Sequence, residues 1–152
     1  MDVAVEGGFF RTGARSPMQW DSSTNCGFSS APSEKLYIML DPSDDRPTVL
    51  SQLNDKDSVL NELKKLILLR KSILALQESA EIKPINTDGY PMVYERCIGQ
   101  QRILIAINPS AKEQICDFDV ELGNIIYQFN GCARFENGRL IIPACSASYI
   151  EI

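Results

Sequence analysis

The stretch Ala14–Asp21 reads A-R-S-P-M-Q-W-D, and N-C-G-F-S follows at Asn25–Ser29. A cation, a proline, a methionine, an amide, the only tryptophan and a carboxylate fall within it, and neither helical nor strand periodicity explains that mixture. Pro17 fixes its own φ and drives Ser16 toward extended geometry. Trp20 adds a large apolar ring that carries a single donor. The stretch therefore predicts a loop that is held in one shape.

These residues are similar to the A-R-[ST]-P-M-Q-W…N-A-G-F pattern of the α-amylase superfamily, glycoside hydrolase family 13. Within that family the resemblance is to the exo-acting α-glucosidases, the oligo-1,6-glucosidases and the trehalose synthase-like enzymes. It implies that the stretch lies late in the catalytic (β/α)8 barrel, in the loop after the eighth strand. Cys26 stands where the family usually has alanine, which is a small change.

The resemblance implies a role for Arg15, because the matching arginine lies at the rim of the substrate pocket, near the leaving-group sugar. A guanidinium there can donate to sugar hydroxyls or pair with a catalytic carboxylate. The alternative for Arg15 is a salt bridge that holds the loop, for example to Asp21. Trp20 is expected to anchor the loop rather than to stack on sugar, and Gln19 to bond neighbouring backbone. The full set of expected loop anchors is Pro17, Gln19, Trp20, Asp21, Asn25 and Phe28.

Catalytic residues are not expected in this chain. Retaining glycosidases need two carboxyl groups about 5–5.5 Å apart, and the resembling enzymes add a third carboxylate and histidines on barrel strands upstream of this stretch. The chain matches none of those motifs and contains no histidine. Asp117 and Asp119 would share one face of a predicted strand, but a solvated outer face accounts for them.

Composition excludes several classes of partner. A net charge of −5 argues against nucleic acid, which attracts clustered Lys and Arg, and no apolar run approaches the roughly 18 residues of a membrane span. The five cysteines are scattered and lack a C-x-x-C pair, which suits neither a zinc site nor a disulfide framework. We expect reduced, mostly buried thiols in a cytoplasmic protein, with no metal and no cofactor.

The clearest single element is an amphipathic helix from Asp57 to about Gln77. Apolar residues recur there at three- and four-residue steps, and Asp55 or Asp57 can cap its start. Leu68 and Leu69 widen the apolar stripe, so the helix should contact core on more than one side. Its S-x-L-N-x-x-x-x-L-I-x-L-R-K run also resembles the last barrel helix of the family.

After Glu78 the apolar period changes to two, and turn residues separate short β-type runs. Asn137-Gly138 is the strongest hairpin signal. Such runs predict an antiparallel sandwich or barrel, and the family ends with a β-sandwich domain directly after its last barrel helix. The predicted strands are Ile82–Asn86, Pro91–Cys97, Arg102–Asn108, Gln114–Val120, Ile125–Asn130, Arg139–Ile142 and Ser148–Ile152.

The predicted fold class is mainly β, with a C-terminal antiparallel β-sandwich like the closing domain of amylases. One long amphipathic helix and an irregular N-terminal segment would precede it. Residues 1–78 would derive from a (β/α)8 barrel, with the loop after strand eight in 1–54 and the last barrel helix in about 57–77. Residues 79–152 would form the sandwich domain.

By resemblance, the chain would be the non-catalytic C-terminal portion of a retaining α-glucosidase-like hydrolase that acts on α-linked gluco-oligosaccharides. Its partners would be oligosaccharide, through the parent enzyme, and either the barrel or a second copy, through exposed apolar surface. The alternative is a stand-alone carbohydrate-binding or protein-interaction β-sandwich module, which an aromatic cluster on an exposed sheet face would favour. Tyr90, in a turn, is the best exposed candidate for stacking on sugar.

Overall fold

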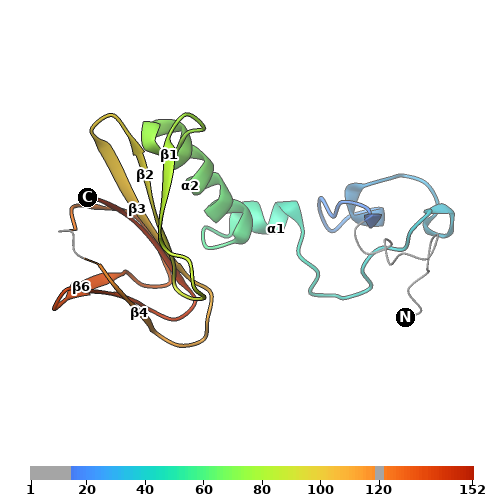
Figure 1. The fold of residues 1–152 in the computed structure, drawn as a ribbon. Coiled ribbons are helices and arrows are strands. Elements are labelled where there is room, and N and C mark those ends of the chain that lie inside the picture. Colours follow the sequence, from blue (N-terminus) through green and yellow to red (C-terminus); the bar gives the residue numbers. More distant parts are fainter. Residues whose placement is uncertain (1–14, 119–121) are drawn as a thin grey trace. The chain divides into compact units, whose positions relative to one another are not determined.

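A computed structural model describes residues 15–118 and 122–152 of the chain (Figure 1). The chain forms two compact units, Met1–Leu66 and Ile67–Ile152, and the division falls inside one helix. The predicted boundary after residue 78 is of a different kind, because it divides the chain by resemblance to a barrel and to a sandwich domain and not by compactness. It stays a prediction. The described chain is mostly β, with one main helix, as the sequence predicts.

The described part of the first unit consists largely of turns, and it contains one short helix that the prediction missed. Two 3₁₀ turns, Thr24–Gly27 and Ser33–Lys35, are followed by α1 (Val49–Asn54). Thr48 caps α1 by accepting from the Ser51 N–H, and Ser51 accepts from the Thr48 N–H, both at 3.0 Å. A helix of less than two turns is too short for a 3.6-residue period to be recognised.

The predicted helix exists, but it is shorter than expected at both ends. It is α2 (Val59–Ser72). Neither Asp55 nor Asp57 is its N-cap, because the Ser58 hydroxyl accepts from the Asn61 N–H at 3.2 Å, which is the capping geometry. Ile73 leaves helical geometry at φ −115° and ψ 116°, so the last predicted turn becomes a separate 3₁₀ turn, η4 (Leu74–Leu76).

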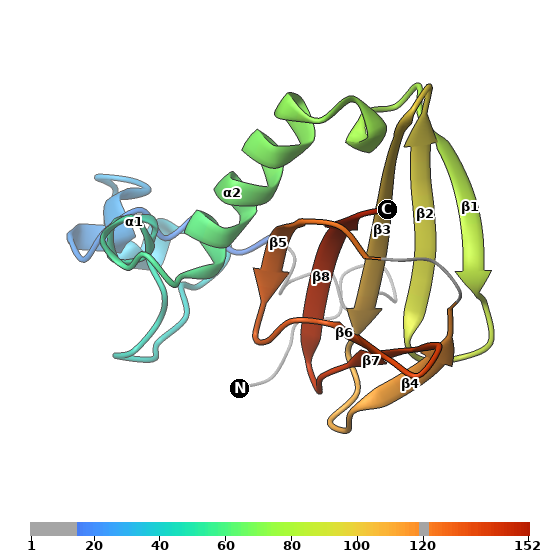
Figure 2. The same cartoon turned by 90° about the vertical axis from the view of Figure 1, so that its left-hand side faces the viewer.

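The second unit is an antiparallel β-sandwich, which confirms the predicted fold class (Figure 2). One sheet has the order β1-β2-β3-β8-β5 and the other the order β4-β7-β6. The strands in the described residues are β1 (Glu81–Asn86), β2 (Met92–Ile98), β3 (Gln101–Asn108), β4 (Gln114–Asp117), β5 (Ile125–Phe129), β6 (Arg134–Glu136), β7 (Arg139–Ile142) and β8 (Ser146–Glu151).

Six of the seven predicted strands differ from the structure by one to three residues at an end, and β6 is not among the predicted strands. The strand predicted at Arg139–Ile142 matches β7, and the predicted hairpin is confirmed. β6 and β7 pair through Asn137 and Gly138, whose φ values of 52° and 77° fit a two-residue turn with left-handed central residues. The last strand lies at Ser146–Glu151 instead of Ser148–Ile152. The strand predicted over 114–120 ends at residue 117, and its residues 119 and 120, including Asp119, lie outside the described residues.

β3 buries side chains on both faces of the larger sheet. Successive residues of a strand point to opposite sides, so Leu104 and Ala106 enter the core between the two sheets, with Leu140 and Ile150 from β7 and β8. The neighbouring residues Ile103 and Ile105 pack on the other side, in a cluster with Ala75 and Leu76 of η4 and with Leu69 and Ile73 at the end of α2. The larger sheet is therefore covered on both faces.

Polar contacts fasten η4 to this outer face. The Arg96 guanidinium donates through Nε to the carbonyl of Ala75 at 3.1 Å and through Nη2 to the carbonyl of Gln77. The Ala75 N–H donates to Gln101 Oε1 at 2.8 Å. Because a short 3₁₀ turn leaves backbone groups unpaired, these three bonds satisfy the groups that face the sheet.

At the other end of β3, Asn108 is fully buried and joins three segments. Its Nδ2 donates to the carbonyls of Lys112 and Pro143 at 2.8 Å and of Ile142 at 3.2 Å, while its Oδ1 accepts from the N–H and hydroxyl of Ser110. The sequence predicted only that a strand ends at Asn108, before Pro109.

Removing the cover of the outer face should destabilise the sandwich. We expect a variant that begins at residue 67 to unfold cooperatively in urea, and one that begins at residue 79 to be less stable by more than about 3 kcal/mol. The reason is that Ile103 and Ile105 would lose most of their burial, and each buried aliphatic side chain contributes about 1.5–3 kcal/mol. Equal urea midpoints for the two variants, with equal slopes, would show that η4 is not needed.

Candidate functional site

The loop that contains the A-R-S-P-M-Q-W-D stretch is fixed mainly through its backbone. The N–H groups of Val49 and Leu50, in the first turn of α1, donate to the carbonyls of Gln19 and Trp20 at 2.9 Å. Gln19 Nε2 also donates to the Pro47 carbonyl at 2.9 Å. Gln19 therefore bonds backbone, and the start of the loop lies beside residues 47–50.

A run of left-handed residues returns the chain to Trp20. Asn25, Cys26 and Gly27 have φ values of 51°, 54° and 70°. This turn aims the Cys26 carbonyl at the N–H groups of Trp20 and Asp21, at 2.8 and 3.3 Å. A Cβ at Gly27 would lie 2.9 Å from Asp21 Oδ2, so the position needs glycine for space as well as for its backbone angle.

Asn25 holds the next part of the loop from a buried position. Its Nδ2 donates to the carbonyls of Ser29 and Ala31 at 2.9 and 2.7 Å, and its Oδ1 accepts from the Ser33 hydroxyl at 2.7 Å. Both N–H donors and the oxygen of this amide are therefore directed at residues 29–33. Asn25 tolerates the left-handed region better than most residues, which suits it to this position.

Asp21 is used within the turn. Its Oδ1 accepts from the N–H and the hydroxyl of Ser23, at 2.8 and 2.5 Å. The hydroxyl bond, followed by the backbone bond, lowers the pKa of Asp21 below its ordinary value of 3.8, because both favour the ionised carboxylate. The side chain of Arg15 lies on the exposed surface at the start of the described residues.

The large apolar side chains of this loop stay on the surface of the unit. Trp20 is 49% exposed, and Met18 and Phe28 are exposed to a similar degree, whereas Pro17 is half-buried. The position of Trp20 is thus set by its backbone bonds and not by burial of its ring. The rings of Trp20 and Phe28 are therefore exposed on a loop whose backbone is held by hydrogen bonds.

Two further contacts of the first unit were not foreseen from the sequence. Arg46 Nε donates to the sulfur of Cys26 at 3.2 Å, and its Nη1 donates to the Ser43 carbonyl at 2.8 Å. Cys26 is only 1% exposed. The guanidinium therefore joins the turn at 41–46 to the left-handed run. The one available signal was Arg46 within the run D-P-S-D-D-R-P, and that run by itself predicts only turns.

The junction between α1 and α2 explains part of the S-x-L-N run. Asn61 Nδ2 donates to the carbonyls of Gln52 and Asp55 at 2.9 and 2.8 Å, and the Ser58 hydroxyl donates to the Gln52 carbonyl at 2.7 Å. In return, Gln52 Oε1 accepts from the Leu60 N–H at 3.0 Å. Serine and asparagine of this run therefore bind carbonyls at the end of α1, in addition to the backbone N–H groups of Asp55 and Ser58 that these carbonyls also accept.

The cysteines are all free thiols, but fewer of them are buried than their scattered positions in the sequence predicted. Cys26 is buried, whereas Cys145 is exposed and the other three are partly exposed. In the described residues no group of three or more potential metal ligands gathers. No helix of the described chain has the length and apolar character required to span a bilayer.

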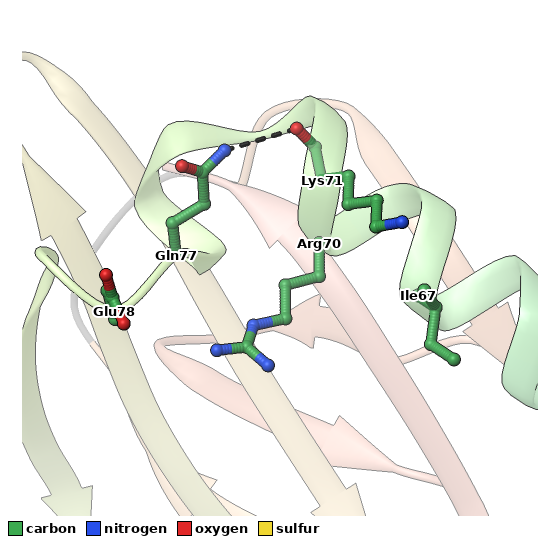
Figure 3. Close-up of a pocket in the computed structure, with 5 residues that line it drawn as sticks. All are labelled: Ile67, Arg70, Lys71, Gln77 and Glu78. Carbon is green, nitrogen blue, oxygen red and sulfur yellow. Dashed lines mark hydrogen bonds between the residues drawn. The ribbon is translucent and has the colours of Figure 1, made fainter.

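The second unit has a groove at the end of α2, lined mostly by polar residues. Ile67, Arg70, Lys71, Gln77 and Glu78 line it, and Gln77 Nε2 donates to the Lys71 carbonyl at 3.1 Å (Figure 3). Cations in the last helical turn are favoured by the helix dipole, so the composition of this groove has a structural explanation. It contains no aromatic ring on which a sugar could stack.

Two aromatic side chains of the sandwich pack against each other. The rings of Tyr127 and Tyr149 meet edge to face, with centroids 5.2 Å apart and an interplanar angle of 60°. Tyr94 and Tyr149 border the cluster of η4, and burial raises the pKa of both phenols. Tyr90 is more than half exposed, as the sequence analysis expected.

Gly27 should be more sensitive to substitution than another left-handed glycine. Gly27→Ala combines a φ of 70° with a contact of 2.9 Å to Asp21, whereas Gly99→Ala has a φ of 57° and open space around its Cβ. The left-handed backbone costs each variant about 1–2 kcal/mol, so any excess in Gly27→Ala measures the clash. Fluorescence of Trp20, the only tryptophan, should report loosening at lower urea concentration in Gly27→Ala alone. An unchanged fluorescence transition in that variant would contradict the geometry of the turn.

Comparison with known proteins gives a family for this chain. Residues 5–79 match the family model described as "Alpha amylase, catalytic domain". The glucan 1,6-alpha-glucosidase of Streptococcus dysgalactiae subsp. equisimilis is 30% identical over 116 residues, which are 76% of this chain and 21% of that protein. A probable oligo-1,6-glucosidase of Bacillus subtilis is 36% identical over 104 residues, 68% of this chain and 18% of that protein. The chain thus spans about a fifth of the length of these relatives.

Solved structures agree on the fold. The isomaltulose synthase of Erwinia rhapontici NX5 superimposes with a TM-score of 0.76 and 24% identity, covering 93% of this chain and 25% of that one. The trehalulose synthase of Pseudomonas mesoacidophila MX-45 gives a TM-score of 0.78 with 20% identity, over 93% of this chain and 26% of that one. Together with the matched loop and helix, these findings show that the chain belongs to the α-amylase family, glycoside hydrolase family 13.

Proposed function

We propose that this chain is the C-terminal, non-catalytic portion of an α-glucosidase-like hydrolase that acts on α-linked gluco-oligosaccharides with retention of configuration. The match to a catalytic-domain model over residues 5–79 supports a barrel origin for the loop and α2. The sandwich that follows would be the closing domain. The relatives named as 1,6-glucosidases support a glucosidic substrate for the parent enzyme.

Exposed apolar surface is the observation that carries this proposal. Val59, Leu63 and Ile67 are 79%, 53% and 45% exposed, and their four-residue spacing places them along one side of α2. A surface helix normally turns such a stripe toward a core. The stripe is expected if the helix belongs against a barrel that is not among the described residues.

The loop would have a matching role. Arg15 would contribute to the rim of the substrate pocket, as the matching arginine does in the resembling enzymes. Trp20 and Phe28 would turn their exposed rings toward the barrel, and the bonds of Asp21 and Asn25 would keep the loop in the shape that this contact requires. Large exposed apolar patches usually mark interaction surfaces, which fits this assignment.

Without the barrel, a second copy of the chain would cover the same surface. The free thiols are compatible with a reducing cytoplasmic location for the protein. The alternative function, a stand-alone carbohydrate-binding module, has less support because Tyr127 and Tyr149 pack on each other and the groove beside η4 lacks an aromatic platform.

The chain alone should be catalytically silent. We expect no turnover of p-nitrophenyl α-glucoside or isomaltose above the rate of a buffer blank, because the sequence has no histidine and no match to the catalytic carboxylate motifs. The positive control is a full-length oligo-1,6-glucosidase assayed at the same molar concentration. Hydrolysis by the purified chain at ordinary glucosidase rates would overturn the proposal.

The exposed stripe of α2 should drive self-association in solution. Sedimentation velocity should show concentration-dependent dimers or larger species, and Leu63→Gln combined with Ile67→Gln should shift the distribution toward monomer. Ile115→Gln provides a matched control, because Ile115 is 51% exposed on β4, outside the stripe. A monodisperse monomer at all concentrations, or an equal effect of the control, would remove the support that the stripe gives.

A further inference from the structure

The second unit contains two asparagines that are followed directly by glycine, at Asn130-Gly131 and Asn137-Gly138. In this dipeptide the side-chain amide can react with the next backbone nitrogen, and glycine has no Cβ to obstruct that approach. The two pairs are the same dipeptide, although the flanking residues differ, F-N-G-C at the first and E-N-G-R at the second. A large difference in reactivity in the folded chain is therefore expected to come from the structure around each pair. The surroundings differ in three respects: hydrogen bonding, packing and strand support.

Asn137 is open to solvent and makes no side-chain hydrogen bond to any described residue. It is exposed, with a φ of 52°, and a Cβ built on Gly138 would meet nothing within 4 Å. The strand before it, β6, has only three residues, all exposed, and pairs with β7 alone. Short segments with exposed hydrogen bonds open locally at low cost.

Asn130, by contrast, is tethered. Its Nδ2 donates to the carbonyls of Ala144 and Cys145 at 3.4 and 3.2 Å. A Cβ on Gly131 would lie 3.3 Å from the ring of Pro143, so the glycine packs against another segment. Reaction at Asn130 therefore requires two hydrogen bonds and a packing contact to break first.

We propose that Asn137 is a site of spontaneous covalent modification, and that the contacts of Asn130 protect the second Asn-Gly pair from the same reaction. In the opened hairpin, the Gly138 nitrogen loses its proton to solvent base and attacks Cγ of Asn137. A new C–N bond forms and the side-chain amide nitrogen leaves as ammonia. Water then opens the five-membered imide at either carbonyl, which gives an aspartyl or an isoaspartyl linkage.

The isoaspartyl product would alter the fold locally. It adds one carbon to the backbone of a two-residue turn, so Glu136 and Arg139 can no longer pair in the present register. It also exposes a carboxylate of the kind that protein isoaspartyl methyltransferases accept, which makes position 137 a site for that class of repair enzyme.

Peptide mapping by mass spectrometry tests the proposal on the full chain, incubated at mildly alkaline pH below its unfolding temperature. We expect conversion at Asn137 to be at least about tenfold faster than at Asn130, since net hydrogen-bond energies of this size separate the two sites. In concentrated urea the two rates should become similar. Methyl transfer by an isoaspartyl methyltransferase should label the peptide that contains position 137.

One variant tests whether the reaction depends on the asparagine side chain at position 137. Asn137→Gln should abolish conversion at position 137, because a six-membered ring closes slowly, and should leave the rate at Asn130 unchanged. Near-ultraviolet circular dichroism checks that this variant keeps the native fold. Equal rates at the two sites in the native chain would overturn the proposal, and so would a rate difference that persists in urea.

Discussion

Burial of β3 on both of its faces is the constraint on which the second unit depends. A sheet with apolar side chains on two sides needs two covers, and the smaller sheet supplies only one of them. The other comes from η4 and the end of α2, through Ala75, Leu76, Leu69 and Ile73. Helical residues before the sandwich are therefore part of its core, which explains why the compact unit begins at Ile67 inside α2.

The fold could be predicted where the signal was local or periodic. Asn137-Gly138 predicted a hairpin because the turn type requires residues that tolerate positive φ. The helical period of apolar residues predicted α2. Other features depended on contacts between distant residues. Leu74–Leu76 forms a separate turn on the sheet because the backbone of Ala75 bonds to the side chains of Gln101 and Arg96. Both side chains come from strands more than twenty residues further along the chain. Ser58 is the N-cap of α2, and its hydroxyl also donates to the Gln52 carbonyl. N-cap propensity alone does not favour Ser58 over Asp55 or Asp57.

The candidate site follows the same division. The sequence of residues 14–29 was specific enough to indicate the family, whereas the anchoring roles predicted for its side chains stay predictions. The contacts that fix the loop could not be predicted, because they join residues far apart in the chain. Arg46 donates to the sulfur of Cys26, twenty residues earlier, and the first N–H groups of α1 donate to the carbonyls of Gln19 and Trp20. The exposure of the Trp20 ring could not be predicted either, since burial depends on which neighbours are present.

The edge of the larger sheet limits how copies of this chain can join. β1 is an edge strand that carries Pro84, which has no N–H to offer a further strand, and its register with β2 shifts between Pro84 and Asn86. Lys83 beside it adds charge, another feature that discourages pairing at an edge. The β1 edge is therefore a poor template for a further strand, and a continuous β-ribbon would not start readily from it.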